Sequence, residues 1–454
     1  MIDINSIRQE YIDLINKNIE GNRRGALDIK DNLEHSPLYY KNRFASYTVQ
    51  IPHIYSKREI DSFEEIVKVA YNIFDKIIRE YMACEDYRAL FKFSKELEEL
   101  ILAPCGYDLT IPITRFDIFY HEDTGKFYFC EINTDGTSGM NEDRIQDELN
   151  IDNLAHQEMI KRYNFYTFEL FDSWVDTFSR IYNTYDNRVD NPNVAIVDFL
   201  DNTTLRELQE FARRFQKAGF NCEICDVREL RYEGGKLYSA TGHAIDAIYR
   251  RAVTVDIMEH YDEVTDFISA IKDNAVFMAG SFKTQIIHHK ILFHILHLPR
   301  TKQFLSSEEI RFIMEHVPST VPLNEHFIDQ ELIINNKDSY IIKPNDDYGS
   351  SGVFAGVEQS QEEWERNVRA VYGGDFICQT YVEQFESLNI DFAFGDGKWH
   401  NYINMAGLYV YGGKFAGVFS RQALSGGIIV SHRNERTQAT YIVRDCPKTH
   451  CSEN

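Results

Sequence analysis

The stretch from Arg115 to Asn133 constrains the fold more than any other part of this 454-residue chain. Two runs rich in aromatic and β-branched residues, RFDIFY and KFYFCEIN, flank Asp123-Thr124-Gly125, which predicts a β-hairpin with a three-residue loop. In that register Arg115 faces Asn133 and Asp117 faces Glu131, and a bulge would shift the pairing by one residue. Because side chains alternate along a strand, these four residues share one face, and the other face carries Phe116, Ile118, Cys130 and Ile132.

The polar face of this hairpin has the composition of a magnesium site. Two carboxylates and an amide oxygen are the hard ligands that Mg²⁺ prefers, with phosphate and water completing its octahedron. We therefore predict that Asp117, Glu131 and Asn133 bind Mg²⁺ beside the fixed cation of Arg115. An exposed hairpin with one Arg–carboxylate ladder would show the same residues, because cross-strand charge pairs are ordinary.

A second segment has the composition of a triphosphate site. Residues 340–344, YIIKP, predict a strand that carries Lys343 into the small-residue loop NDDYGSSG, and VFAG predicts the next strand. A lysine supplies a point charge, and loop amides free of side-chain bulk can wrap phosphates. A flexible hairpin turn is the alternative interpretation. The candidate nucleotide-binding residues of this segment are Lys343, Gly349, Ser350, Ser351 and Gly352.

Charge and composition narrow the classes of function. The net charge of −23 disfavours nucleic acid as a partner, because phosphate backbones require basic patches. No apolar run approaches membrane-spanning length, and the polar, amphipathic start resembles neither a signal nor a transit peptide. Eight cysteines without framework spacing predict a reduced, cytoplasmic protein. Cys222 and Cys225 form a CxxC that we interpret as part of a buried strand, in preference to a zinc site.

Breaks in the pattern divide the chain into predicted parts. Residues 1–105 predict a helical layer, and residues 106–190 hold the hairpin and a long helical stretch with an apolar stripe. Residues 191–275 predict a small α/β segment, residues 276–440 a nucleotide-binding part, and residues 441–454 a polar tail. Arg250 and Arg251 follow a strand of the small segment. Since ligands bind at the carboxyl ends of such strands, either arginine is a candidate for a substrate carboxylate, with a surface ion pair as the alternative.

The order of these motifs resembles that of a known family. Asp117 followed by Glu131-x-Asn133 resembles the metal-binding signature of ATP-grasp ligases. The forms RFD and EINTDGTSG are similar to those of two circularly permuted members, the synthetase domain of glutathionylspermidine synthase and eukaryotic glutathione synthetase. In those enzymes the metal-binding hairpin precedes the lysine that grips ATP. The resemblance implies an α+β or α/β chain with a circularly permuted ATP-grasp fold, a small α/β substrate domain and an N-terminal helical layer.

The resemblance also implies further site residues. Lys290, in a helix written KTQIIHHKIL, stands at the position of an ATP-contacting lysine. The segment FICQTYVE stands where backbone groups pair with adenine and a glutamate meets the ribose, which gives Gln379, Tyr381, Val382 and Glu383. Arg421 occupies the position of an arginine that contacts the transferred phosphoryl group in that family, and we assign the same role to Arg115. The loop after Asn133 stands at the acid substrate, with Thr137 and Ser138 as candidate contacts.

The ordered set predicts an ATP- and Mg²⁺-dependent carboxylate–amine ligase. Such enzymes phosphorylate a carboxylate to an acylphosphate, which an amine attacks, and they release ADP and phosphate. Their work is positioning and charge neutralisation. A phosphotransferase with the same ATP site and a nucleotide-binding protein without turnover are the alternatives. The predicted partners are a small carboxylate and a small amine, and the oligomeric state stays open, a homodimer included.

Overall fold

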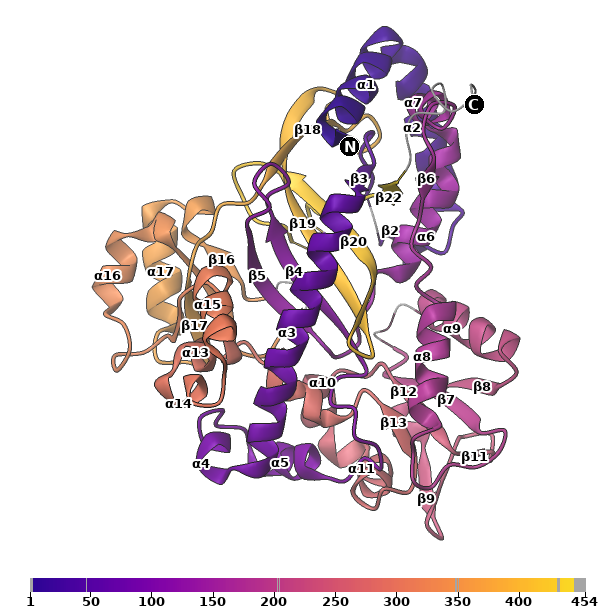
Figure 1. Ribbon diagram of the computed structural model, residues 1–454, viewed down its shortest axis with the longest axis vertical. Helices are drawn as coiled ribbons and strands as arrows, with labels where there is room; N and C mark the ends of the chain where they lie inside the picture. The colour runs from indigo at the N-terminus through magenta and orange to yellow at the C-terminus, as the bar shows by residue number, and fades with distance from the viewer. Residues whose placement is uncertain are drawn as a thin grey trace.

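The computed structural model describes residues 3–444, apart from residues 46, 202, 204, 348, 350, 431 and 432. Its centre is an antiparallel sheet across which the long helix α3 (Lys57–Ala83) lies (Figure 1). The strands follow the order β21 (Arg436–Thr437), β20 (Lys414–Leu424), β19 (Trp399–Tyr411), β4 (Ile113–Tyr120) and β5 (Phe127–Asn133), with β18 (Glu386–Ile390) added on β19. The predicted hairpin is therefore joined to strands that follow it by almost 300 residues.

The predicted register of the hairpin is confirmed between Arg115 and Asp117, and a bulge shifts it by one residue between there and the loop. Arg115 pairs with Asn133 and Asp117 with Glu131, after which the register shifts, so that Ile118 pairs with Phe129 and Cys130 is left between. A bulge turns two successive side chains toward the same side. Cys130 consequently lines the same cavity as Glu131, and its predicted place on the opposite face is wrong.

The N-terminal layer is mainly helical, as predicted. Ser56 and Glu59 form a capping box that starts α3, and the buried stripe Phe63, Val67, Ala70, Phe74, Ile77 and Tyr81 packs into the core. Short strands interrupt the layer. Its other elements are α1 (Ile4–Lys17), α2 (Ile19–Glu34), β1 (Tyr39–Tyr40), β2 (Arg43–Phe44), β3 (His53–Ser56), α4 (Glu85–Arg88) and α5 (Lys95–Leu102).

The helical stretch after the hairpin is broken into short helices. α6 (Met140–Leu149), η1 (Asn150–Asp152) and α7 (Leu154–Met159) lead through β6 (Phe165–Tyr166) to α8 (Asp172–Tyr182). The apolar stripe predicted on α8 is confirmed, since Trp174, Val175, Phe178, Ile181 and Tyr182 are all buried. No helix among the described residues is both long and apolar enough to cross a membrane.

The small α/β segment contains a parallel sheet, in the order β13 (Phe277–Ala279), β12 (Ala247–Arg250), β7 (Asn193–Asp198) and β8 (Asn221–Asp226). The predicted boundary at residue 275 is too early, because β13 pairs with β12. Cys222 and Cys225 lie in β8, as predicted. The remaining elements are α9 (Leu205–Lys217), η2 (Val227–Glu229), β9 (Arg231–Glu233), β10 (Lys236–Tyr238), β11 (Ala244–Ile245), α10 (Thr254–Glu259), η3 (Tyr261–Glu263) and α11 (Thr265–Lys272).

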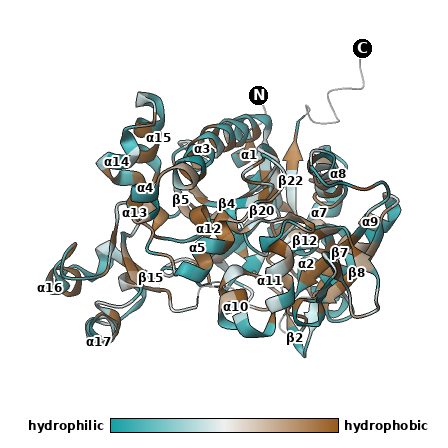
Figure 2. Cartoon of the chain, turned by 90° about the horizontal axis from the view of Figure 1, so that it is seen from below, coloured by the Kyte–Doolittle hydropathy of each residue, from teal (hydrophilic) through white to brown (hydrophobic). Residues whose placement is uncertain are grey.

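A separate antiparallel sheet carries the predicted lysine strand. Its order is β14 (Thr320–Pro322), β17 (Phe376–Thr380), β15 (Tyr340–Pro344) and β16 (Phe354–Ala355). Helices α16 (Gln330–Asn335) and α17 (Gln361–Val371) pack on it through the buried Trp364. In Figure 2 both helices show hydrophilic outer sides, and hydrophobic residues gather near the middle of the molecule. Preceding this sheet are η4 (Phe282–Thr284), α12 (Gln285–His288), α13 (Leu292–His297), α14 (Pro299–Lys302) and α15 (Ser307–His316); η5 (Lys337–Ser339) and η6 (Gly356–Glu358) flank β15 and β16.

Two predicted details of this half are wrong. The helix expected around Lys290 stops at His288, because His289 is extended, and the N–H of Lys290 instead donates to the Asn345 carbonyl at 2.9 Å. The polar tail does not begin at residue 441. Residues Thr440–Val443 form the buried strand β22, which pairs with β3 and β6. Residues 445–454 lie outside the described residues.

Asp143 on α6 gives the fold a testable pH dependence. Its Oδ1 accepts the Thr440 N–H at 3.0 Å, and burial raises the pKa of this carboxyl to about 8. Between about pH 4 and pH 8 the unfolded chain loses a proton that the folded chain keeps, so the free energy of unfolding falls by up to about 1.4 kcal/mol per pH unit. Asp143→Asn keeps the acceptor and cannot ionise. We expect a flatter pH profile in denaturant titrations, whereas the exposed Asp123→Asn should retain the wild-type slope.

Candidate active site

A cavity lies where the hairpin and β19–β20 meet the sheet that carries Lys343. It holds roughly 730 Å³ of unfilled space, its open mouth included. One part is apolar and the other is charged. The residues that line it are Phe119, Cys130, Glu131, Lys290, Ile341, Lys343, Asp347, Val353, Gln379, Thr380, Tyr381, Val382, Gln384, Met405, Arg421, Ile428 and Ile429.

The predicted site residues divide into those that line this cavity and those that do not. The lining includes Glu131, Lys290, Lys343, Gln379, Tyr381, Val382 and Arg421. Glu383 comes directly after the lining residue Val382, and its carbonyl accepts a hydrogen bond from the His121 ring at 3.1 Å. Gly349, Ser351 and Gly352 lie in the loop between β15 and β16, outside the lining, and Ser350 is outside the described residues.

Two lysines reach the charged part of the cavity from different elements. Lys343 on β15 is 5 % exposed, and its Nζ donates to Gln379 Oε1 at 2.9 Å and to the Cys130 carbonyl at 3.1 Å. Lys290 is 4 % exposed, and its Nζ donates to the Asp347 carbonyl at 2.8 Å. Both ammonium groups are therefore held mainly by neutral oxygens. A phosphate would be a stronger partner for each of them.

Glu131 lies among these cations. Burial raises the pKa of its carboxyl, but the charges of Lys290, Arg421, Lys343 and Arg115 lower it to about 2. The carboxylate is therefore ionised at neutral pH. It accepts a hydrogen bond from Asn133 Nδ2 at its Oε1, and this bond is 3.3 Å long, which leaves most of its acceptor capacity for other ligands.

Asp117 lies behind the cavity and is fully buried. Arg115 Nε donates to Asp117 Oδ1 at 2.7 Å, and Arg115 Nη2 donates to Oδ2 at 3.0 Å. Oδ2 also accepts from Asn133 Nδ2 at 2.8 Å and from Arg421 Nη2. Both guanidinium groups face the ring of Phe419, with centroid distances of 5.4 and 5.5 Å.

The predicted magnesium ligands fit the ion in part. Glu131 and Asn133 supply hard oxygens, and Mg²⁺ needs only one or two carboxylates when phosphates and water complete its shell. No group of three or more His, Cys, Asp or Glu residues suited to a metal occurs among the described residues. Asp117 does not fit, because both of its oxygens are engaged by the arginines and Asn133.

The candidate substrate residues Thr137 and Ser138 do not line the cavity. The carbonyl of Ser138 accepts from Arg115 Nη1 at 2.6 Å and from the Tyr409 hydroxyl at 2.8 Å, so this loop does lie beside Arg115. The Ser138 side chain is exposed, whereas Thr137 is buried and its Oγ1 donates to the Asn133 carbonyl at 3.1 Å.

Arg250 and Arg251 are engaged by the protein itself. Arg250 Nη2 pairs with Asp135 at 2.7 Å, and its other nitrogens donate to the carbonyls of Gly280 and Ala252. Arg251 Nη2 pairs with Glu207 at 2.8 Å, and both ion pairs are buried. A substrate carboxylate would therefore have to displace an existing partner.

Sequence reasoning missed several residues of the cavity, among them Phe119, Met405 and Ile428. The signal for Phe119 was present, because alternation places it on the same face as Arg115 and Asp117. Cys130 was predicted on the wrong face of the strand because no local sequence pattern indicates the bulge. Met405 and Ile428 reach the cavity through long-range pairing of β19 and β20, which no local pattern reveals.

Gly407 on β19 makes room for the buried arginine. It pairs with Asp117, and a Cβ there would lie 2.7 Å from Arg115 Cδ and 2.8 Å from Asp117 Oδ1. Gly407→Ala should therefore displace Arg115 and lower the ATP turnover that the sequence predicts by about 10²-fold, as misplacement by 1 Å commonly does. The measurement is ADP release together with thermal melting. In Gly219→Ala the added Cβ meets nothing within 4 Å, so strain at φ +95° should cost stability alone; equal losses of turnover in both variants would contradict this account.

Comparison with known proteins places the fold. No protein-family model matches this chain, and no curated protein matches it in sequence. Among solved structures it is similar to a glutathione synthetase-like effector from Globodera pallida, at 12% identity and a TM-score of 0.59, over 92% of this chain and 96% of that one. The two chains share a fold.

Two other solved structures are more distant. A putative gamma-glutamylcysteine synthetase from Methylobacillus flagellatus KT matches at 10% identity and a TM-score of 0.44, over 82% of this chain and 87% of that one. D-alanyl-alanine synthetase A from Vibrio cholerae O1 biovar eltor matches at 8% identity and a TM-score of 0.26, over 55% of this chain and 89% of that one.

Proposed function

We propose that this protein is an ATP-dependent carboxylate–amine ligase of the permuted ATP-grasp type, which activates its acid as an acylphosphate and releases ADP and phosphate. The observation that carries the proposal is a single cavity with an apolar part and a part that contains Glu131, Lys290, Lys343 and Arg421. A nucleotide has the same two-part character. The chain order, with the hairpin ahead of the lysine strand, supports the permuted form.

In this proposal the apolar part takes the adenine ring. Ile341 and Val353 come from the lysine sheet, and Ile428 and Ile429 follow β20, so a flat ring would be covered from both lobes. The backbone of Tyr381 and Val382, and Glu383 beyond it, would meet the edge of the base and the ribose. Lys343 and Lys290 would bind the phosphates, and Gly349, Ser351 and Gly352 of the loop would cover them with backbone amides.

Glu131 and Asn133 would hold Mg²⁺, which when bound would neutralise phosphate charge and orient the γ-phosphoryl group. Arg421 lies at the cavity wall, and Arg115 lies behind it. Two fixed guanidinium groups would stabilise the charge that develops on the transferred phosphoryl group and on the tetrahedral intermediate. The acid would approach from the Thr137–Ser138 loop, which touches Arg115 through the Ser138 carbonyl.

The test is a screen of pooled carboxylates and amines with Mg-ATP, in which ADP and AMP are separated by ion-pair chromatography. A ligase should release ADP only when both an acid and an amine are present. ADP release with the acid alone, together with a stable phosphorylated product, would support the phosphotransferase instead. Nucleotide binding without turnover in any pool would contradict both enzyme assignments.

A further inference from the structure

Both carboxylate oxygens of Asp117 already accept hydrogen bonds from the protein. A carboxylate offers about four lone-pair sites on its two oxygens. Oδ1 accepts from Arg115 Nε, and Oδ2 accepts from Arg115 Nη2, Asn133 Nδ2 and Arg421 Nη2, so a metal ion would have to compete with four donors. Glu131, directly across the hairpin, has one long hydrogen bond from Asn133 and stays open toward the cavity.

The place of Asp117 in the sheet separates it further from the cavity. It lies on β4 between β19 and β5, and it is 0 % exposed. Arg421 and Glu131 line the cavity, whereas Asp117 does not. The facing residue on β19 is Gly407, whose missing side chain leaves space for the Arg115 guanidinium to reach the carboxylate.

We propose that Asp117 is a positioning residue that fixes Arg115 and Arg421 for phosphoryl transfer, and that it is not a ligand of the magnesium ion. The inference rests on the proposed function. Two buried guanidinium groups that share the Phe419 ring would repel each other, and the carboxylate between them holds both in one place. Arg421 Nε, which has no acceptor among the described residues, is left as a donor for an anionic ligand.

The first test measures divalent-ion dependence and nucleotide preference together. Mn²⁺ replaces Mg²⁺ and is followed by electron paramagnetic resonance in the presence of ATP or ADP. We expect Asp117→Asn to leave the half-saturating Mn²⁺ concentration within twofold of wild type and to lower the preference for ATP over ADP by about tenfold, because the arginines that meet the γ-phosphate lose their anchor. Glu131→Gln should raise the Mn²⁺ requirement at least about tenfold with both nucleotides.

Asp391→Asn is the matched control. Asp391 is 2 % exposed and accepts from Arg436 Nε at 2.8 Å, so it is another buried aspartate paired with an arginine, outside the cavity lining. It should lower the melting temperature and leave both the Mn²⁺ requirement and the ATP-over-ADP preference unchanged. A change in preference equal to that of Asp117→Asn would show a general loss of structure and would overturn the proposal.

The second test is a double-mutant cycle between Asp117 and Arg421. If Asp117 acts through the arginine, Asp117→Asn combined with Arg421→Gln should lower the ATP-over-ADP preference no further than Arg421→Gln alone. Additive effects would overturn the proposal. The double variant also removes the Arg421 charge, which Asp117→Asn leaves without the Asp117 carboxylate. If Asp117→Asn alone does not fold, the Mn²⁺ titration is therefore carried out on the double variant.

The outcomes separate this inference from the function on which it rests. A wild-type protein that binds neither Mn-ATP nor Mn-ADP would contradict the proposed function, and the inference would fail with it. A wild-type protein that binds both, with Asp117→Asn raising the Mn²⁺ requirement as much as Glu131→Gln, would overturn the inference alone and make Asp117 a metal ligand.

Discussion

Replacing Lys343 by methionine is expected to weaken Mg-ATP binding by roughly tenfold to a hundredfold. The substitution keeps most of the buried side-chain volume and removes a charge-assisted contact to phosphate of about 1.5–3 kcal/mol. The side chain is nearly inaccessible, and Gln379 Oε1 and the Cys130 carbonyl fix its Nζ in the cavity. Isothermal titration calorimetry with Mg-ATP measures the effect directly.

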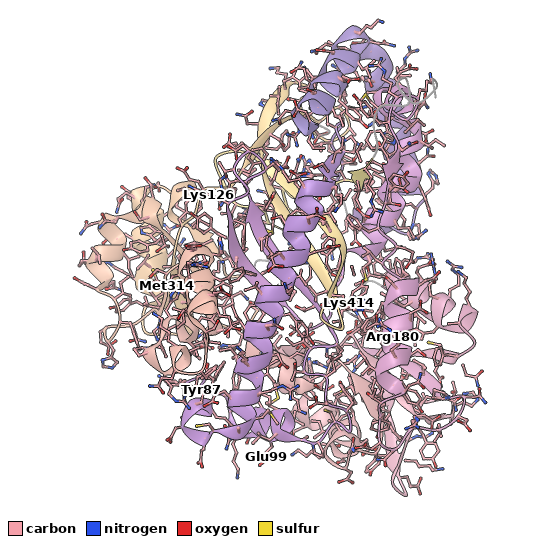
Figure 3. All side chains as sticks on the ribbon, in the orientation of Figure 1. Tyr87, Glu99, Lys126, Arg180, Met314 and Lys414 are labelled. Atoms are coloured by element: carbon pink, nitrogen blue, oxygen red, sulfur yellow. The ribbon has the colours of Figure 1, made fainter. Side chains whose placement is uncertain are left out.

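The control for this substitution is Lys414→Met. Lys414 is the exposed first residue of β20, at the end of the central sheet opposite to Lys126 of the hairpin loop (Figure 3). It should bind Mg-ATP as tightly as the wild type. An unchanged affinity in Lys343→Met would mean that the charged part of the cavity does not bind the phosphates.

Glu131→Gln is expected to abolish measurable turnover, with a loss of at least about 10²-fold, and to keep the fold. Glutamine preserves the size of the side chain and an acceptor oxygen. It removes the charge that lies among Lys290, Lys343 and Arg421, and with it the proposed magnesium carboxylate. The measurement is ADP release with the substrate pair found by the screen, together with circular dichroism for the fold.

Glu122→Gln is the matched control from the same hairpin. Glu122 pairs with Arg8 at 2.8 Å and with His53 at 2.8 Å, and it ties the hairpin to α1 and β3. Its loss should lower the melting temperature and leave turnover unchanged. Glu131→Gln protein that turns over at the wild-type rate would remove the hairpin from the catalytic machinery.

The hairpin and its polar face could be predicted from the sequence because their causes are local. Alternation along a strand and the Asp-Thr-Gly loop determine which side chains share a face. The register held from Arg115 to Asp117, and it failed at Cys130, where the chain bulges. A bulge of one residue changes no composition, so the sequence gives no warning of it.

The partners of Asp117 could not be predicted, because they come from distant parts of the chain. Arg421 reaches the carboxylate from β20, 304 residues further along the chain. An aspartate beside an arginine and an asparagine is equally compatible with a metal site and with an ion-pair cluster. Only the long-range pairing of β4 with β19 decides between them.

Some features that were predicted wrongly do have a signal in the sequence. The final segment contains Tyr441, Ile442 and Val443, an apolar run typical of a buried strand, and all three are buried in β22. The break at His289 had no such signal, since helical periodicity continues through it. That break lets Lys290 contact the loop after β15 through both its backbone and its side chain.

The central claim, that the protein makes an amide through an acylphosphate, is tested most directly by isotope transfer. The acid found by the screen is supplied with ¹⁸O in its carboxylate, together with Mg-ATP and the amine, and the released phosphate is examined by mass spectrometry. Because the carboxylate oxygen attacks the γ-phosphoryl group, one ¹⁸O should appear in each phosphate and none in ADP. Amide that accumulates with unlabelled phosphate, or with AMP as the product, would contradict the account.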